Sequence, residues 1–287
     1  MFAIPEGIYK RAGLLSAAVI VAATAFTLPG SLASASTSRT SVETPKPTIV
    51  LVHGAWADGS SWKKVTERLQ ADGYTVDVPP VPLRGVASDA AYLDAYLADV
   101  TGPIILVGHS YGGMVITNAA VGQPEVKALV YVDAYVPAQG DSLNSLTGAL
   151  PGSILNQPAQ NVFNIVSYPA SVTGGAAGAD LYVKPSVYGQ AFANEGISPK
   201  EEAVLEAEQR PLSAGAVTEA SGPPAWKTIP SWSVIGMQDQ ILPAAEQVAM
   251  DQRAGTHMLK VNAPHLSMVT DPDAVVFQIL AAAKATA

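Results

Sequence analysis

The sequence predicts an α/β fold, in which a mostly parallel six-stranded sheet is flanked by helices and a helical cap is inserted after the fourth strand. From Pro47 onward, short apolar segments alternate with segments of helical periodicity, which is typical of successive βαβ units. The stretch 137–230 then interrupts this alternation, and a structureless connection of that length is implausible in a compact domain. A composition of 48% hydrophobic and 14% charged residues also favours a globular body.

The individual elements follow from local patterns. Strands are predicted where β-branched and aliphatic residues cluster, and the third is wholly apolar, as expected of a central parallel strand. Helices are predicted from apolar spacing and from acidic residues near their starts. The predicted strands are 48–53, 74–78, 104–107, 127–133, 232–236 and 257–261; the predicted core helices are 61–72, 88–99, 111–121 and 273–283; and the predicted cap helices are 186–194 and 199–209.

Residues 1–35 have the features of a signal peptide. Lys10-Arg11 precede an apolar run over 12–28, and a Pro-Gly pair and the small residues Ala33-Ser34-Ala35 follow, which predicts cleavage after Ala35. The alternative is an uncleaved anchor helix, because the run is close to the ~17 residues that just span a bilayer. We therefore expect a secreted or extracytoplasmic protein with no stable membrane insertion after cleavage. The predicted division is signal peptide 1–35, linker 36–46, core 47–136 and 231–287, and helical cap 137–230.

Charge and residue usage exclude several function classes. A net charge of -8 without clustered Lys and Arg disfavours nucleic-acid partners. The absence of Cys excludes disulfides, thiolate metal sites and a cysteine nucleophile. No two His have ligand spacing on one element, and the glycines around Ser110 do not form G-x-G-x-x-G, so no metal and no cofactor are expected. A small molecule is the expected partner; the oligomeric state is left open.

The segment Gly108-His109-Ser110-Tyr111-Gly112 fits G-x-S-x-G and joins a buried strand to a helix. In that context the serine lies in a tight turn that exposes its Oγ, and the small flanking residues let the two backbones approach. The alternative is an ordinary glycine-rich turn with an incidental serine. The surrounding partners favour Ser110 as a nucleophile.

A serine nucleophile needs an adjacent base, and histidine suits that role. His265 follows the last predicted strand, and parallel-sheet proteins place their sites beyond the carboxyl ends of strands. It also satisfies the chain order serine, acid, histidine that accompanies this type of turn. The remaining histidines are better explained by packing or strand positions: His53, His109 and His257.

The imidazole in turn requires a carboxylate that fixes its tautomer. Asp239, after the fifth predicted strand, is favoured, and Asp133, at the end of the fourth, is the rival. Two backbone amides should receive the developing oxyanion. These are Tyr111, directly after the nucleophile, and Ala55 in the loop after the first strand.

Together these motifs resemble the α/β-hydrolase superfamily, and more narrowly the small esterase-like group that includes plant methylesterases, hydroxynitrile lyases and bacterial relatives. The resemblance runs from Pro47 to the C-terminus and is strongest over 49–56, 106–113 and 221–230. It implies a triad of Ser110, Asp239 and His265. The dehalogenases and most epoxide hydrolases of the superfamily use Asp as nucleophile, so the serine here argues against those activities.

The expected function is hydrolysis of a small-molecule carboxylic ester through an acyl-enzyme on Ser110. One alternative uses the same triad without acylation, as a hydroxynitrile lyase or a cofactor-free oxygenase with His265 as the base. The other is a non-catalytic binding protein that has kept the pocket. Substrate identity is expected to depend on the cap, whose aromatic residues either line a pocket or form its own core.

Overall fold

The computed structural model describes residues 45–173, 177–192, 194 and 196–287. The predicted signal peptide, and all of the predicted linker except residues 45 and 46, lie outside the described residues. Within the described part of the chain, no helix combines the length and the apolarity that crossing a membrane requires.

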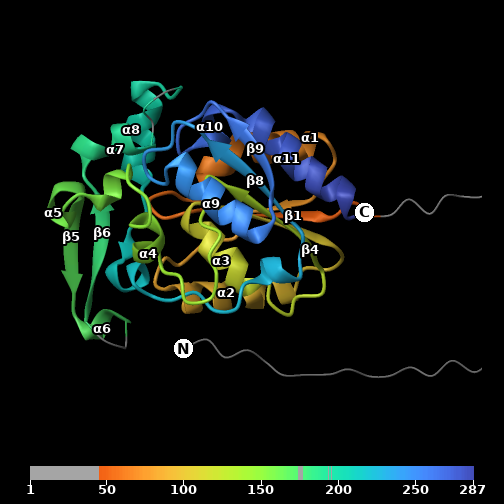
Figure 1. Ribbon diagram of the computed structural model, residues 1–287, viewed down its shortest axis with the longest axis horizontal. Helices are drawn as coiled ribbons and strands as arrows, with labels where there is room; N and C mark the ends of the chain where they lie inside the picture. Colours follow the sequence, from red (N-terminus) through yellow and green to blue (C-terminus); the bar gives the residue numbers. More distant parts are fainter. Residues whose placement is uncertain (1–44, 174–176, 193, 195) are drawn as a thin grey trace, which may run out of the picture. The chain divides into compact units, whose positions relative to one another are not determined.

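A parallel sheet of six strands forms the centre of the described chain, which confirms the predicted fold class (Figure 1). All neighbouring strands in it run parallel. The third strand of the chain is buried at every residue, because helices cover both faces of the sheet. In spatial order the strands are β2 (Val76–Asp77), β1 (Thr48–Val52), β3 (Ile104–His109), β4 (Val126–Val132), β8 (Ser231–Gly236) and β9 (His257–Val261).

Helices pack on both faces of this sheet. On one face, α1 (Lys63–Ala71) packs against α11 (Pro272–Ala285), and on the other α2 (Val86–Ala98) packs against α3 (Tyr111–Ala119), as right-handed crossovers require (Figure 1). After β8, α9 (Ala244–Ala254) packs against that strand. Helix α9 was not predictable from the sequence, because its residues AAEQVAMDQRA show no clear apolar stripe. Two short helices precede α1 and α11: η1 (Gly59–Trp62) and α10 (Ser267–Thr270).

The second predicted strand is shorter in the structure than in the sequence analysis. The prediction covered 74–78, whereas β2 contains only Val76 and Asp77. The backbone N–H of Tyr74 donates to the carbonyl of Leu69 at 3.0 Å and so belongs to the turn that ends α1. Two prolines, which offer no backbone donor, follow immediately after Val78 and limit the strand at its other end.

The insert between β4 and β8 is mixed rather than purely helical. The two predicted helices are present as α7 (Pro185–Phe192) and α8 (Pro199–Glu208). The prediction of a helical cap missed a three-stranded antiparallel sheet of β5 (Phe163–Tyr168), β6 (Gly178–Val183) and β7 (Leu212–Ser213). No residue of β5 is buried, β6 is only partly buried, and β7 contains two residues, so none of the three shows the apolar run of a buried strand. The remaining insert elements are α4 (Leu143–Thr147), η2 (Ile154–Asn156), α5 (Ala159–Val162), α6 (Ala170–Thr173), η3 (Ala214–Val217) and η4 (Ala225–Lys227).

One carboxyl group, that of Asp251 in α9, lies buried against β8. Its Oδ2 accepts a hydrogen bond from Ser233 Oγ at 2.5 Å, and among the described residues its Oδ1 has no partner. Burial raises the pKa of Asp251 to about 7, and the bond from Ser233 opposes that shift. The carboxyl group is therefore protonated in mildly acidic solution and carries an uncompensated charge in mildly alkaline solution.

We expect Asp251→Asn to stabilise the protein at about pH 8, and to stabilise it less at about pH 5. The folded-state pKa lies above the unfolded value of 3.8, so the free energy of unfolding falls as the pH rises from about 4 to about 7. Asparagine still accepts from Ser233 but cannot ionise, and it should recover at most roughly 4 kcal/mol at the higher pH. Thermal unfolding of both proteins at the two pH values measures this. An equal effect at both would contradict the prediction.

Candidate active site

Ser110 lies between the end of β3 and the start of α3 in a backbone conformation that L-residues rarely adopt, with φ 52° and ψ -121°. Its backbone N–H donates to Val132 O at 3.2 Å. Its carbonyl accepts from the N–H of Gly113 at 2.9 Å and from that of Tyr135 at 3.2 Å. Such a strained conformation persists only where the surroundings impose it. Here β4 and the segment after it hold the serine side chain at the carboxyl end of the sheet.

Glycines at two positions allow this turn. A Cβ on Gly108 would lie 2.7 Å from the carbonyl oxygen of Gly112, and a Cβ on Gly112 would lie 2.7 Å from that of Val52. Both distances are below any normal contact of a Cβ atom. The pattern of glycines around Ser110 is therefore required by the close approach of β3, α3 and β1.

The structure brings Ser110, His265 and Asp239 together in one hydrogen-bonded series. His265 Nε2 is 2.9 Å from Ser110 Oγ, and His265 Nδ1 is 2.7 Å from Asp239 Oδ2. All three side chains are buried, with residue exposures of 3%, 1% and 6%. If Nδ1 carries the proton and donates it to the carboxylate, Nε2 is left to accept the hydroxyl proton of Ser110. Burial lowers the pKa of His265 to about 3, which favours this neutral form near pH 7.

Four donors surround the carboxylate of Asp239. Its Oδ1 accepts from the backbone N–H groups of Ile241 and Leu242, both at 2.8 Å, and its Oδ2 accepts from Gln247 Nε2 at 2.9 Å in addition to His265. Burial raises the pKa of Asp239, and the backbone and Gln247 donors oppose the shift. Gln247 was not predictable from the sequence, because no pattern indicates that α9 packs beside the site.

Asp133, the rival acid, makes no hydrogen bond to His265 among the described residues. Its Oδ1 accepts from the N–H of Gly236 at 2.7 Å and its Oδ2 from the N–H of Ser267 at 3.0 Å. Burial raises the pKa of Asp133, and the nearby charge of Asp239 raises it further. Asp133 therefore bridges the end of β8 and the segment that follows His265, and the imidazole bonds to Asp239 instead.

The other three histidines lie in different surroundings. His109 is fully buried and its Nε2 lies 2.9 Å from the backbone carbonyl of His265, so it packs against the loop that carries His265. His53 Nε2 accepts from the N–H of Val81 at 3.0 Å. His257 is exposed on β9. None of the three contacts Ser110 Oγ through a hydrogen bond among the described residues.

The two residues predicted to supply oxyanion amides both border the cavity at Ser110. Tyr111 is the first residue of α3, where a backbone N–H has no partner within the helix and the helix dipole is positive. Ala55 lies in the loop after β1. That loop packs closely against the strained turn at Ser110 between β3 and α3, called the elbow below, because a Cβ on Gly54 would lie 2.7 Å from Ser110 Cβ. Both amides are therefore held beside the serine.

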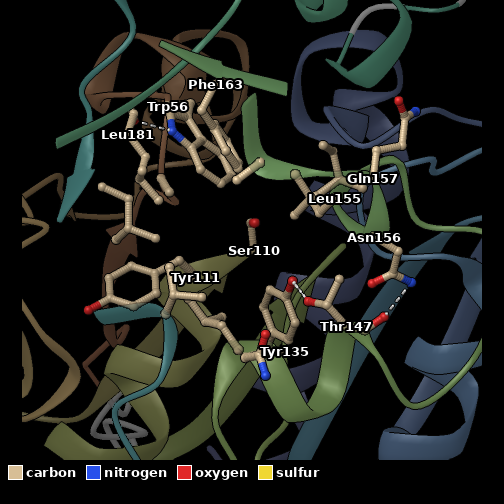
Figure 2. Close-up of a pocket in the computed structure, with 17 residues that line it drawn as sticks. Trp56, Ser110, Tyr111, Tyr135, Thr147, Leu155, Asn156, Gln157, Phe163 and Leu181 are labelled. Carbon is tan, nitrogen blue, oxygen red and sulfur yellow. Dashed lines mark hydrogen bonds between the residues drawn. The ribbon is translucent and has the colours of Figure 1, made fainter. Parts of the chain in front are cut away.

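A cavity of about 370 Å³ opens above Ser110 and is lined from both the core and the insert. Figure 2 shows Ser110 at its centre, with Trp56, Phe163 and Leu181 on one side and Leu155, Asn156 and Gln157 on another. No described residue that lines it is an Asp, Glu, Lys or Arg. Of the insert aromatics, Phe163 borders the cavity, whereas Tyr188 and Phe192 are buried and do not line it.

The sequence profile of the alpha/beta hydrolase family matches residues 49–278. The carbendazim hydrolyzing esterase of Nocardioides sp. (strain SG-4G) is 39% identical over an aligned length of 122 residues, and the match covers 38% of this chain and 50% of that protein. The pyrethroid hydrolase of Sphingobium wenxiniae is 34% identical over 116 residues, 36% of this chain and 41% of that one. The chain thus spans about half the length of the curated relatives it matches. Polyneuridine aldehyde esterase has the same fold, with a TM-score of 0.70 and 17% identity over 83% of this chain and 99% of that one.

Proposed function

This chain belongs to the alpha/beta hydrolase family, and from that premise we propose that it hydrolyses carboxylic esters through an acyl-enzyme formed on Ser110. The observation that carries the proposal is the series from Ser110 Oγ through the imidazole of His265 to the carboxylate of Asp239, at 2.9 and 2.7 Å, beside an uncharged cavity. A hydroxyl with a base at that distance, and a base with an acid behind it, is the arrangement that nucleophilic acyl transfer requires.

In the acylation step, Ser110 Oγ attacks the carbonyl carbon of the ester while its proton passes to His265 Nε2. The carbonyl oxygen becomes an anion, which the backbone N–H groups of Ala55 and Tyr111 stabilise. Asp239 stays ionised and stabilises the imidazolium. The bond from the carbonyl carbon to the alcohol oxygen then breaks, and His265 returns its proton to the leaving alcohol.

In the deacylation step, a water molecule takes the place of the alcohol. His265 Nε2 accepts one of its protons as its oxygen attacks the acyl carbon, and the same two amides stabilise the second oxyanion. The bond from the acyl carbon to Ser110 Oγ breaks, and the serine recovers its proton from His265. The products are a carboxylic acid, an alcohol and the unchanged enzyme.

The cavity lining supports a neutral small-molecule ester as substrate. Its walls are mainly aliphatic and aromatic, and a charged group would lose its hydration there without gaining a partner of opposite charge. The two curated relatives above are named for acting on carbendazim and pyrethroids. Together with the uncharged lining, these names support the proposal that this chain also hydrolyses a neutral small-molecule ester.

We expect the protein to hydrolyse p-nitrophenyl esters, with a rate that falls when the acyl chain outgrows the cavity. The cavity of about 370 Å³ is of the size that holds a small ligand, so acetate to hexanoate should exceed palmitate. Initial rates across the acyl series, with the chain starting at Ser36, provide the measurement. If the folded protein hydrolyses none of these esters, the proposal fails, and cyanide release or oxygen consumption would then favour the lyase or oxygenase.

Export stays a prediction that rests on residues 1–35. Protein recovered from outside secreting cells should begin at Ser36. An intact Met1 in that fraction would contradict cleavage after Ala35.

A further inference from the structure

Trp56 follows Ala55 directly and connects the oxyanion loop to the insert. Its backbone N–H donates to the carbonyl of Arg210 at 2.9 Å, and its indole Nε1–H donates to the carbonyl of Leu181 at 2.8 Å. Its own carbonyl accepts from the hydroxyl of Tyr188 at 3.3 Å. All three of these partners lie within the insert, in the segment before β7, in β6 and in α7.

The ring of Trp56 also packs on the insert. It stacks on Phe163 of β5, with centroids 5.4 Å apart and planes 25° apart, and it meets the edge of Phe192 at 6.1 Å. Phe192 in turn lies 5.5 Å from the ring of His265. Figure 2 shows the indole beside Phe163 with its N–H directed at Leu181. The side chain is almost fully buried, so these contacts are desolvated.

The backbone of Trp56 is in a conformation that needs such support. Its φ is 57°, in the left-handed region that a bulky residue rarely adopts. A residue holds that conformation only where several contacts impose it. The hydrogen bonds that act on Trp56 come from the insert, whereas the preceding Gly54 is pressed against the elbow of the core. The peptide groups between these two residues are therefore set from both sides.

We infer that Trp56 is a positioning residue through which the insert sets the backbone amide of Ala55 against Ser110. The insert then completes the oxyanion site in addition to covering the cavity. This inference rests on the proposed function, because an oxyanion arises only if Ser110 attacks a carbonyl group. A residue that merely walls the cavity should change substrate binding, whereas one that positions an oxyanion donor should change the stabilisation of the tetrahedral state.

Two substitutions weaken the hydrogen bonds between Trp56 and the insert but keep an aromatic ring at each position. Trp56→Phe deletes the indole donor to Leu181 and keeps a ring to stack on Phe163. Tyr188→Phe deletes only the hydroxyl that bonds to the carbonyl of Trp56. We expect Trp56→Phe to lower kcat by about tenfold or more with KM within about twofold, which is less than the roughly hundredfold cost of losing an oxyanion donor outright. Tyr188→Phe, which breaks the longer bond, should lower kcat by about threefold.

Two controls separate positioning from packing. Phe163→Leu alters the cavity wall but none of the three hydrogen bonds, so it should act mainly on KM. Trp232→Phe makes the same chemical change in β8, where the ring packs against that of His257 on the neighbouring edge strand β9, and it should change neither kcat nor KM. If Trp56→Phe and Tyr188→Phe raise KM and leave kcat unchanged, the inference is wrong. Tyr188→Phe keeps the test decisive if Trp56→Phe does not fold.

A second readout does not depend on ester turnover. An aryl trifluoromethyl ketone adds to a reactive serine and forms a tetrahedral adduct whose charged oxygen occupies the oxyanion site, whereas the matching methyl ketone binds as a planar ligand. Trp56→Phe should weaken the binding of the trifluoromethyl ketone by about tenfold and should hardly change the binding of the methyl ketone. Equal losses for both ketones would overturn the inference. A wild-type protein that forms the adduct but hydrolyses no ester would instead refute the proposed function and leave this comparison valid.

Discussion

Replacing Ser110 with alanine is expected to abolish ester hydrolysis, lowering kcat by roughly a millionfold, as removal of the nucleophile of a complete triad does elsewhere. Without Oγ no acyl-enzyme forms, and His265 has no hydroxyl proton to accept at the 2.9 Å position. Residual turnover through the oxyanion amides and a water molecule should stay near the background of the assay. Initial rates with p-nitrophenyl butyrate measure the loss of hydrolysis, and labelling by a fluorophosphonate measures the loss of the nucleophilic hydroxyl.

The substitution should leave the fold intact, so a loss of activity is attributable to chemistry. Serine and alanine both carry a Cβ, so the strained φ of 52° costs the same in either protein. Ser60→Ala, at an exposed position in η1, is the matched control and should keep full activity. If Ser110→Ala retained ester hydrolysis and the control behaved like it, the acyl-enzyme mechanism would be refuted. Retained labelling at another residue would identify a different nucleophile.

Asp239→Asn should lower kcat by about ten thousandfold with little change in KM. The asparagine carbonyl still accepts from the N–H groups of Ile241 and Leu242, but its NH₂ then faces His265 Nδ1. That contact favours the tautomer with the proton on Nε2, which cannot accept the proton of Ser110. The imidazolium would also lose its buried counter-charge. Steady-state kinetics over a range of pH provide the measurement.

Asp133→Asn is the matched comparison, because both acids are buried and both receive backbone N–H donors. At Asp133 the new NH₂ opposes the N–H of Gly236 or of Ser267, so we expect a loss of about 1–3 kcal/mol in the free energy of unfolding. The effect on kcat should be far smaller than that of Asp239→Asn. A larger loss of activity from Asp133→Asn would assign the acid role to Asp133.

The elbow was predictable from the sequence because its requirements are local. The close approach of β3 and α3 forces glycine at Gly108 and Gly112, and the apolar strand before them identifies the buried position. His265 and Asp239 were selected from chain order, since the carboxyl ends of parallel strands meet at one edge of the sheet. In the structure the imidazole of His265 does lie within hydrogen-bonding distance of both Ser110 and Asp239.

The insert was less predictable, because its structure depends on contacts that no local pattern records. In the antiparallel sheet of β5, β6 and β7, no residue of β5 is buried, β6 is only partly buried and β7 has two residues, so no apolar run of the kind found in a buried strand marks it. Gln247 reaches Asp239 only because α9, which lacks an apolar stripe, turns back toward the end of β8. In each case the partner that stabilises the element is distant in sequence.

The sequence alone therefore determined the parallel sheet, the strained serine turn and the pool of candidate acids and bases. These follow from steric and hydrophobic rules that act over a few residues. Only the tertiary structure showed which of Asp239 and Asp133 bonds to His265, since both follow a strand of the sheet and they differ in the donors that reach them. It also decided that Trp56 bonds to Arg210, Leu181 and Tyr188, because pairing across more than a hundred residues depends on the folded chain, not on local pattern.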